Sequence, residues 1–165
     1  MKREEHKPIL IVGFGNPSIR EESIGIEVVK KIRQHVWPKH VQFEINNKTN
    51  DLPLEVFYDH EFVIFIISAH TNHPIGNVRG FKEVQGRPYY WTKCSFDIAL
   101  KRLLEKIHAR NEETMIDLVL ISIGGEDEKV RPGNEFWKAN LKEIEDSVAD
   151  LVFDYLASPR ETSVG

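Results

Sequence analysis

The sequence predicts an α/β protein, organised as a three-layer α/β/α sandwich with a mostly parallel central sheet. Three continuous apolar runs, at 8–13, 62–67 and 116–123, are typical of strands that are buried on both faces of a parallel sheet. Segments with helical periodicity separate these runs, as parallel connections require. A chain of 165 residues can bury one core, so we expect a single domain over 1–158 and a C-terminal tail over 159–165.

The first apolar run, at 8–13, is a predicted strand closed by glycine, and a loop at 14–23 leads from it into a helix. Apolar residues recur at every fourth position of this helix, and polar residues occupy its other sides. We expect the helix to end at Pro38, because proline cannot continue the hydrogen-bonding pattern. The apolar stripe consists of Ile24, Val28, Ile32 and Val36.

The middle of the chain contains three predicted strands and a short helix. Residues 41–45 alternate between apolar and polar, which is typical of a half-covered strand near an edge. A short helix is expected over 52–58, because Asp51 can cap its first turn. The run at 62–67 is the most hydrophobic stretch and is predicted to be a central strand. A further strand is predicted over 78–84, antiparallel at an edge.

The last third contains a buried strand between two helices. Thr92 or Ser95 can cap the first of these helices. The strand covers 116–123 and ends at Gly124-Gly125. The apolar stripes are Phe96, Leu100, Leu103, Leu104 and Ile107 in the first helix, and Trp137, Leu141, Ile144, Val148, Leu151 and Tyr155 in the last.

Composition limits the class of function. Lys and Arg number 22 against 26 Asp and Glu, a formal charge of −4, which argues against general binding to nucleic acid or anionic membranes. No apolar run approaches the roughly 20 residues of a transmembrane helix, and the N-terminus lacks a signal-peptide pattern. The single cysteine, Cys94, excludes an internal disulfide and a zinc site built on several thiolates. We therefore expect a cytoplasmic protein.

Ligands of such sheets bind beside the carboxyl ends of the strands, here the loops at 14–23, 68–77 and 124–134. The first loop opens on Gly13-Phe14-Gly15, like a dinucleotide-binding fingerprint. The third glycine of that fingerprint is replaced by Ser18, and two acids precede the helix. Because carboxylates at a helix entrance repel a pyrophosphate, we reject the nucleotide interpretation.

The two acids, Glu21 and Glu22, allow two interpretations. Acids in a first turn commonly do no more than complement the helix dipole, which stabilises by a few tenths to about 1 kcal/mol. Alternatively, one carboxylate points across the edge of the sheet and binds a hard or borderline cation.

The segment 13–25, GFGNPSIREESIG, resembles the opening motif of the hydrogenase maturation endopeptidases. The order of elements from 8 to 155 is similar as well, including the segments at 74–78 and 123–134. The resemblance implies a peptidase that removes the C-terminal extension of a nickel-loaded hydrogenase large subunit. It also implies that Glu22 binds the nickel, which the protein substrate carries, so that no cofactor is bound permanently. Asn16 would shape the loop.

The sequence departs from that family at two ligand positions. Where the family has an aspartate after the central strand this chain has Ser68, and where it has a histidine this chain has Lys93 or Cys94. A hydroxyl and an ammonium cannot replace a carboxylate and an imidazole as metal ligands. His70 and His73 lie just beyond Ser68 and can supply imidazole nitrogens, although solvated loop histidines are the simpler interpretation.

We therefore expect Glu22 and His70 to be the metal ligands of a cleft. The cleft would be lined by Asn16, Ser68, His73, Lys93 and Cys94. Two alternatives stay open. One is a non-catalytic relative that acts as a binding or scaffold protein. The other is a cysteine peptidase using Cys94, since Lys93 and a helix N-terminus both stabilise a thiolate, in a distant resemblance to the pyroglutamyl peptidases.

Overall fold

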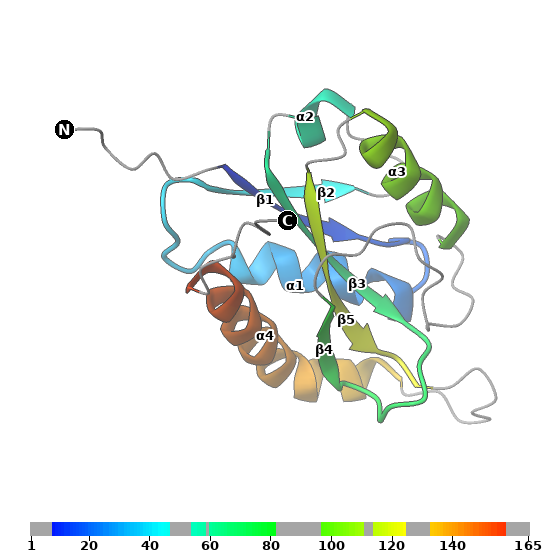
Figure 1. Ribbon diagram of the computed structural model, residues 1–165. Helices are drawn as coiled ribbons and strands as arrows, with labels where there is room; N and C mark the ends of the chain where they lie inside the picture. The colour runs from blue at the N-terminus through cyan, green and yellow to red at the C-terminus, as the bar shows by residue number, and fades with distance from the viewer. Residues whose placement is uncertain are drawn as a thin grey trace.

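The computed structural model of the protein describes residues 8–46, 54–58, 60–81, 97–110, 114–124 and 133–157. Its centre is a five-stranded sheet in the order β2-β1-β3-β5-β4, in which only β4 runs antiparallel, so the predicted α/β architecture with a mostly parallel central sheet is confirmed (Figure 1). The strands are β1 (Ile9–Phe14), β2 (Val41–Asn46), β3 (Phe62–Ala69), β4 (Val78–Phe81) and β5 (Met115–Ser122). The helices are the 3₁₀ turn η1 (Glu21–Ser23), α1 (Ile24–Ile32), α2 (Leu54–Tyr58), α3 (Asp97–Arg110) and α4 (Asn134–Ala157).

Helices cover both faces of the sheet. Gly13 of β1 is in register with Ile66 of β3, and both lie beneath α1: a Cβ at Gly13 would contact Val29. Successive residues of a strand point to opposite faces, so Phe65 points the other way. On that opposite face, Phe65 stacks on Phe57 of α2, with ring centroids 5.9 Å apart.

The central strands are apolar and buried on both faces, as predicted for the run at 62–67. In β3, every residue after Phe62 is buried, and β5 is buried to the same extent after its first residue. In contrast, the alternating pattern of β2 places it at the edge of the sheet. A buried strand has no solvent face to keep polar, which explains why its sequence does not alternate.

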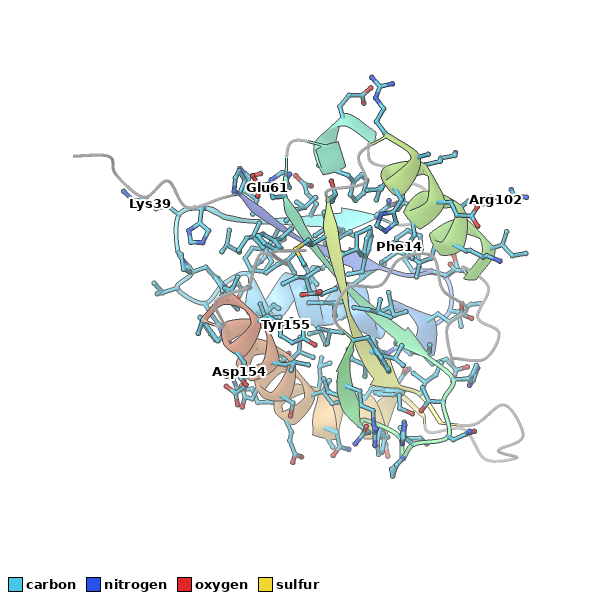
Figure 2. All side chains as sticks on the ribbon, viewed as in Figure 1. Phe14, Lys39, Glu61, Arg102, Asp154 and Tyr155 are labelled. Carbon is cyan, nitrogen blue, oxygen red and sulfur yellow. The ribbon has the colours of Figure 1, made fainter. Side chains whose placement is uncertain are left out.

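Helix α4 packs along α1 and across β4 (Figure 1). Figure 2 shows Tyr155 on the inner side of α4 and its neighbour Asp154 on the outer side, and Tyr155 is buried while Asp154 is exposed. The Tyr155 hydroxyl lies over Gly80, where a Cβ would overlap it. In this part of the chain the predicted helical stripe is confirmed: Trp137, Ile144, Val148 and Tyr155 are buried, and Leu141 and Leu151 pack against the core.

The prediction that the first helix continues to Pro38 is wrong. Helix α1 ends at Ile32, and Val36, the last residue of the predicted stripe, is 93% exposed. The cause is Trp37, whose Nε1 donates a hydrogen bond of 2.6 Å to the Ile32 carbonyl. Its ring stacks on Phe153 of α4 at 4.2 Å, so burying a large aromatic surface outweighs one more helical turn.

The other elements agree with prediction within the described residues. Helix α3 buries Leu100, Leu104 and Ile107, and β4 is antiparallel at an edge as expected. The proposed caps Asp51, Thr92 and Ser95, the stripe residue Phe96, positions 82–84 of the predicted edge strand and the tail at 159–165 lie outside the described residues. None of the helices that the structure describes is long and apolar enough to cross a membrane.

Gly25 gives the first testable prediction. It is the second residue of α1, where alanine normally favours the helix by about 1 kcal/mol. A Cβ at this position would lie 2.6 Å from the Ile66 carbonyl oxygen, so main-chain atoms would have to move. We expect Gly25→Ala to lower the free energy of unfolding by about 1–3 kcal/mol in urea titrations. Gly133→Ala is the control, because a Cβ there contacts nothing within 4 Å, and equal stability of both variants would contradict the prediction.

Glu145 gives a second prediction. It is 6% exposed on α4, and burial raises the pKa of its carboxyl despite the opposing attraction of Lys142, Lys31 and His35. The folded state therefore holds the proton more tightly than the unfolded state, so this contribution to stability is lost as pH rises above the usual carboxyl range. We expect Glu145→Gln to be more stable than wild type at pH 7, and relatively less so at pH 4, in paired urea titrations. The exposed Glu105→Gln on α3 serves as control, and a pH-independent difference for Glu145→Gln would contradict the prediction.

Candidate functional site

Three loops meet at one edge of the sheet, where the parallel strands β1, β3 and β5 end. They are the connection from β1 to α1, the connection from β3 to β4, and the residues after β5. The first turn of α4 lies at the same edge, since Arg20 Nε donates to Asn134 Oδ1 at 3.1 Å. This is the edge at which ligands bind in open α/β sheets.

Asn16 folds the loop after β1. Its Oδ1 accepts from the amide of Ser18 at 3.0 Å, and its carbonyl oxygen accepts from the amide of Ile19 at 3.2 Å. Its own amide donates to the Glu22 carbonyl at 3.2 Å, which closes the loop on itself. Gly15 belongs to the same closure, because a Cβ there would overlap that carbonyl oxygen. Asn16 is 4% exposed, so it acts as a loop-forming residue rather than as an exposed side chain.

Glu22 lies in η1, and only 7% of it is exposed. Its neighbour Glu21 is fixed by Ser68, whose buried Oγ donates to the Glu21 carbonyl at 2.7 Å. Within the turn itself, Ser23 Oγ donates to the Arg20 carbonyl at 2.6 Å. The carboxylate of Glu22 is therefore carried on a turn that is tied to the end of β3 and is not turned toward bulk water.

Ser68 has a different role from the one that a ligand would have. The hydroxyl donates its single proton to a main-chain carbonyl across 47 residues of sequence. This hydrogen bond tethers the turn η1 to the carboxyl end of the central strand β3.

Arg20 was not singled out by sequence reasoning. It forms an ion pair with Glu27 of α1 and the hydrogen bond to Asn134 of α4. Both partners are about one-third exposed, so the ion pair contributes little stability by itself. Its effect is to connect the loop that carries Glu22 to the helix that follows β5. No local pattern predicts this contact, because Arg20 and Asn134 are 114 residues apart.

His70 is 5% exposed and its Nδ1 lies 3.1 Å from the Gly124 carbonyl oxygen. A carbonyl oxygen only accepts, so Nδ1 is the donor in this contact, and in the Nδ1–H tautomer of the ring the lone pair lies on Nε2. The main-chain carbonyl thus engages Nδ1, which leaves Nε2 as the ring nitrogen that can act as a ligand or as a base. Gly124 has a φ of +87°, a conformation that glycine adopts without strain.

Two buried hydroxyls, of Thr71 and Ser122, fix the loop that contains His70 and His73. Ser122 Oγ donates to the His73 carbonyl at 2.9 Å, so in the 2.6 Å contact between the two hydroxyls Thr71 is the donor. Ser122 Oγ also accepts from the Gly124 amide at 3.2 Å, and Thr71 Oγ1 accepts from the His73 amide at 3.0 Å. This network fixes the His73 main chain, while its half-buried side chain is not one of the bonded groups. Thr71 lies two residues beyond β3 and Ser122 is the last residue of β5, so hydroxyl residues near the ends of these two strands were the sequence signal that could have revealed the network.

The structure brings part of the predicted site together. Asn16, Glu22 and Ser68 belong to one hydrogen-bonded unit, and His70 belongs to the adjoining loop. Within the described ranges, no three His, Cys, Asp or Glu side chains group closely enough to hold a metal ion. A catalytic zinc site has three protein ligands, so Glu22 and His70 do not form a resident metal centre by themselves. The predicted cleft residues Lys93 and Cys94 lie outside the described residues.

The sequence matches no family model and no curated protein. The fold, however, is similar to that of solved hydrogenase maturation proteases. The [NiFe] hydrogenase maturation protease HycI from Thermococcus kodakarensis KOD1 superposes with a TM-score of 0.64 at 16% identity, covering 92% of this chain and 94% of that one. The hydrogenase maturating endopeptidase HybD from E. coli gives a TM-score of 0.62 at 15% identity, covering 90% and 93%.

The hydrogenase 2 maturation peptidase from Thaumarchaeota archaeon SCGC_AB-539-E09 gives a TM-score of 0.57 at 17% identity, covering 92% of this chain and 99% of that chain. The similarity extends over nearly the whole length of each protein, so it concerns the complete architecture. The resemblance predicted from residues 13–25 is thus confirmed: this chain has the fold of the hydrogenase maturation proteases, in a strongly diverged sequence.

Proposed function

We propose that the chain is a peptidase of the hydrogenase maturation type, acting in the cytoplasm on the nickel-carrying precursor of a hydrogenase large subunit. The reaction would remove a C-terminal extension. The observation that supports this most directly is the placement of Glu22, a nearly buried carboxylate fixed at the ligand-binding edge of this fold.

In this proposal the metal ion arrives with the substrate. The Glu22 carboxylate and the Nε2 lone pair of His70 are donors suited to a borderline divalent ion such as nickel. Two donors leave most of a coordination shell open, which suits an ion whose remaining ligands belong to the precursor. The described residues thus bind and orient the substrate, and we assign none of them to the attack on the peptide bond.

A second candidate is a non-catalytic relative that binds the same kind of precursor without cleaving it. Ser68 favours this candidate, because its neutral hydroxyl is engaged in a main-chain hydrogen bond where the resembled family has an aspartate. The third candidate, a cysteine peptidase using Cys94, concerns a residue outside the described ranges and stays a prediction.

A cleavage assay with Glu22→Gln tests the peptidase proposal. We expect wild type to shorten a nickel-loaded large-subunit precursor, and the variant to do so at least about 10–100-fold more slowly, because a ligand to the ion is lost. Glu21→Gln is the matched control: it removes the neighbouring acid of the same turn, and we expect near wild-type cleavage. Near wild-type cleavage by both variants would mean that the two acids only complement the helix dipole, and an equal loss in both would contradict a specific role for Glu22.

Calorimetric titration of the nickel-loaded precursor separates the two main candidates. If wild type binds the precursor but leaves its length unchanged, the non-catalytic candidate replaces the peptidase. If wild type neither binds nor cleaves, both proposals fail.

Ser68→Ala tests whether the tether positions Glu22. The variant leaves the Glu21 carbonyl without this donor, so we expect a loss of about 1–3 kcal/mol in the free energy of unfolding. We also expect faster hydrogen exchange at the amide of Asn16, which is bonded to the Glu22 carbonyl of the tethered turn. Ser18→Ala, an exposed change in the same loop, is the control. Unchanged exchange at Asn16 would show that η1 holds its place without the hydroxyl.

A further inference from the structure

A hollow lies beside the candidate site, between the loop from β3 to β4 and the first half of α4. Residues of both segments line it, and Figure 1 shows them near the lower end of β4. The hollow has a volume of about 200 Å³, which suits one side chain rather than a drug-sized ligand. It is lined by Ile75, Gly76, Phe136, Asn140, Glu143, Ile144 and Ser147.

The apolar part of the lining comes from Ile75, Phe136 and Ile144. Ile144 is 3% exposed, and Phe136 packs edge-on against the buried ring of Trp137 at 5.1 Å, so these walls are fixed by the core. Gly76 has a φ of +88°, and a Cβ there would lie 3.6 Å from Ile144 Cδ1. The absence of a side chain at Gly76 therefore keeps this part of the hollow open.

The polar part of the lining is rich in acceptors. Asn140 donates from Nδ2 to the Phe136 carbonyl at 2.8 Å, which leaves its Oδ1 to accept from a ligand. The Glu143 carboxylate only accepts, and it is the one charged side chain among the described residues that line the hollow. Ser147 contributes a hydroxyl that can accept as well.

A ligand that satisfies both parts has an apolar stem and a cationic, donor-only tip. Lysine and arginine side chains have this chemistry, since their methylene groups lie along apolar surface while the head group keeps polar partners. An acidic side chain would be repelled by Glu143. We propose that the hollow binds a lysine or arginine side chain of the partner protein.

The hollow and the candidate site are parts of one edge. The Gly76 amide donates to the Ser122 carbonyl at 2.8 Å, and Ser122 Oγ holds the loop of His70 and His73. Asn134, at the start of the same helix α4, is bonded to Arg20 of the Glu22 loop. A chain segment at this edge can therefore place one basic residue in the hollow. The inference that the partner is the precursor rests on the proposed function. The inference that the bound side chain is basic rests only on the residues that line the hollow.

Amide-resolved NMR titration tests the proposal with three blocked amino acids: Nα-acetyl-arginine amide, Nα-acetyl-lysine amide and Nα-acetyl-norleucine amide. Norleucine has a similar stem without charge. We expect saturable shifts at the amides of Ile75, Gly76 and Ile144 with the two cationic probes, and binding about fivefold weaker with norleucine. Glu143→Gln should weaken the cationic probes by a similar factor, and Asp150→Asn, an exposed acid elsewhere on α4, should leave them unchanged.

Several results would overturn the proposal: no saturable shifts at these amides, equal binding of norleucine, or no effect of Glu143→Gln. Tighter binding of spermidine than of the blocked amino acids would assign the hollow to a small polyamine instead of a protein side chain. The outcome is separable from the proposed function, because Glu22→Gln leaves the lining of the hollow unchanged. Cationic probes that bind both wild type and Glu22→Gln, with no cleavage of the precursor, would keep the hollow and reject the peptidase.

Discussion

The close approach of the β1–α1 loop to the end of β3 is the contact on which the rest of the candidate site depends. Gly25 permits it, since a Cβ there would lie 2.6 Å from the Ile66 carbonyl oxygen. Ser68 then adds a hydrogen bond from the strand end to Glu21. Glu22, the next residue, is buried as a consequence of this contact. Main-chain packing thus fixes the turn that carries the Glu22 carboxylate.

The neighbouring loops are fixed by neutral groups in the same way. The hydroxyls of Thr71 and Ser122 and the carbonyl of Gly124 hold the segment that carries His70. The hydroxyl and main-chain bonds of this network keep their geometry over a wide pH range, because neither kind of group titrates near neutrality. The edge of the sheet is therefore a fixed frame that contains Glu22 and His70.

Sequence reasoning predicted most of the fold. Continuous apolar runs identified β1, β3 and β5, since a strand buried on both faces must be apolar throughout. It failed at the end of α1, where helical periodicity extends to Val36 but the chain turns at Ile32. The turn allows Trp37 to pack against Phe43 and Phe153. Phe153 belongs to α4, and the periodicity of the first helix cannot predict a contact with so distant a segment. Of the candidate site, the motif at 13–25 singled out Glu22, whereas Arg20, Thr71 and Ser122 were missed because their partners are distant in sequence.

The sequence by itself determined the alternation of strands and helices, the burial of the central strands and the resemblance in the first loop. These properties depend on residues within one turn or one strand of each other, so they can be recognised locally. Only the tertiary structure decided that Ser68 acts as a tether, that His70 holds a proton on Nδ1, and that Glu143 borders a hollow lined in part by apolar side chains. Each of these depends on which main-chain atom or side chain arrives opposite the residue, and that is fixed by the packing of the whole sheet against its helices.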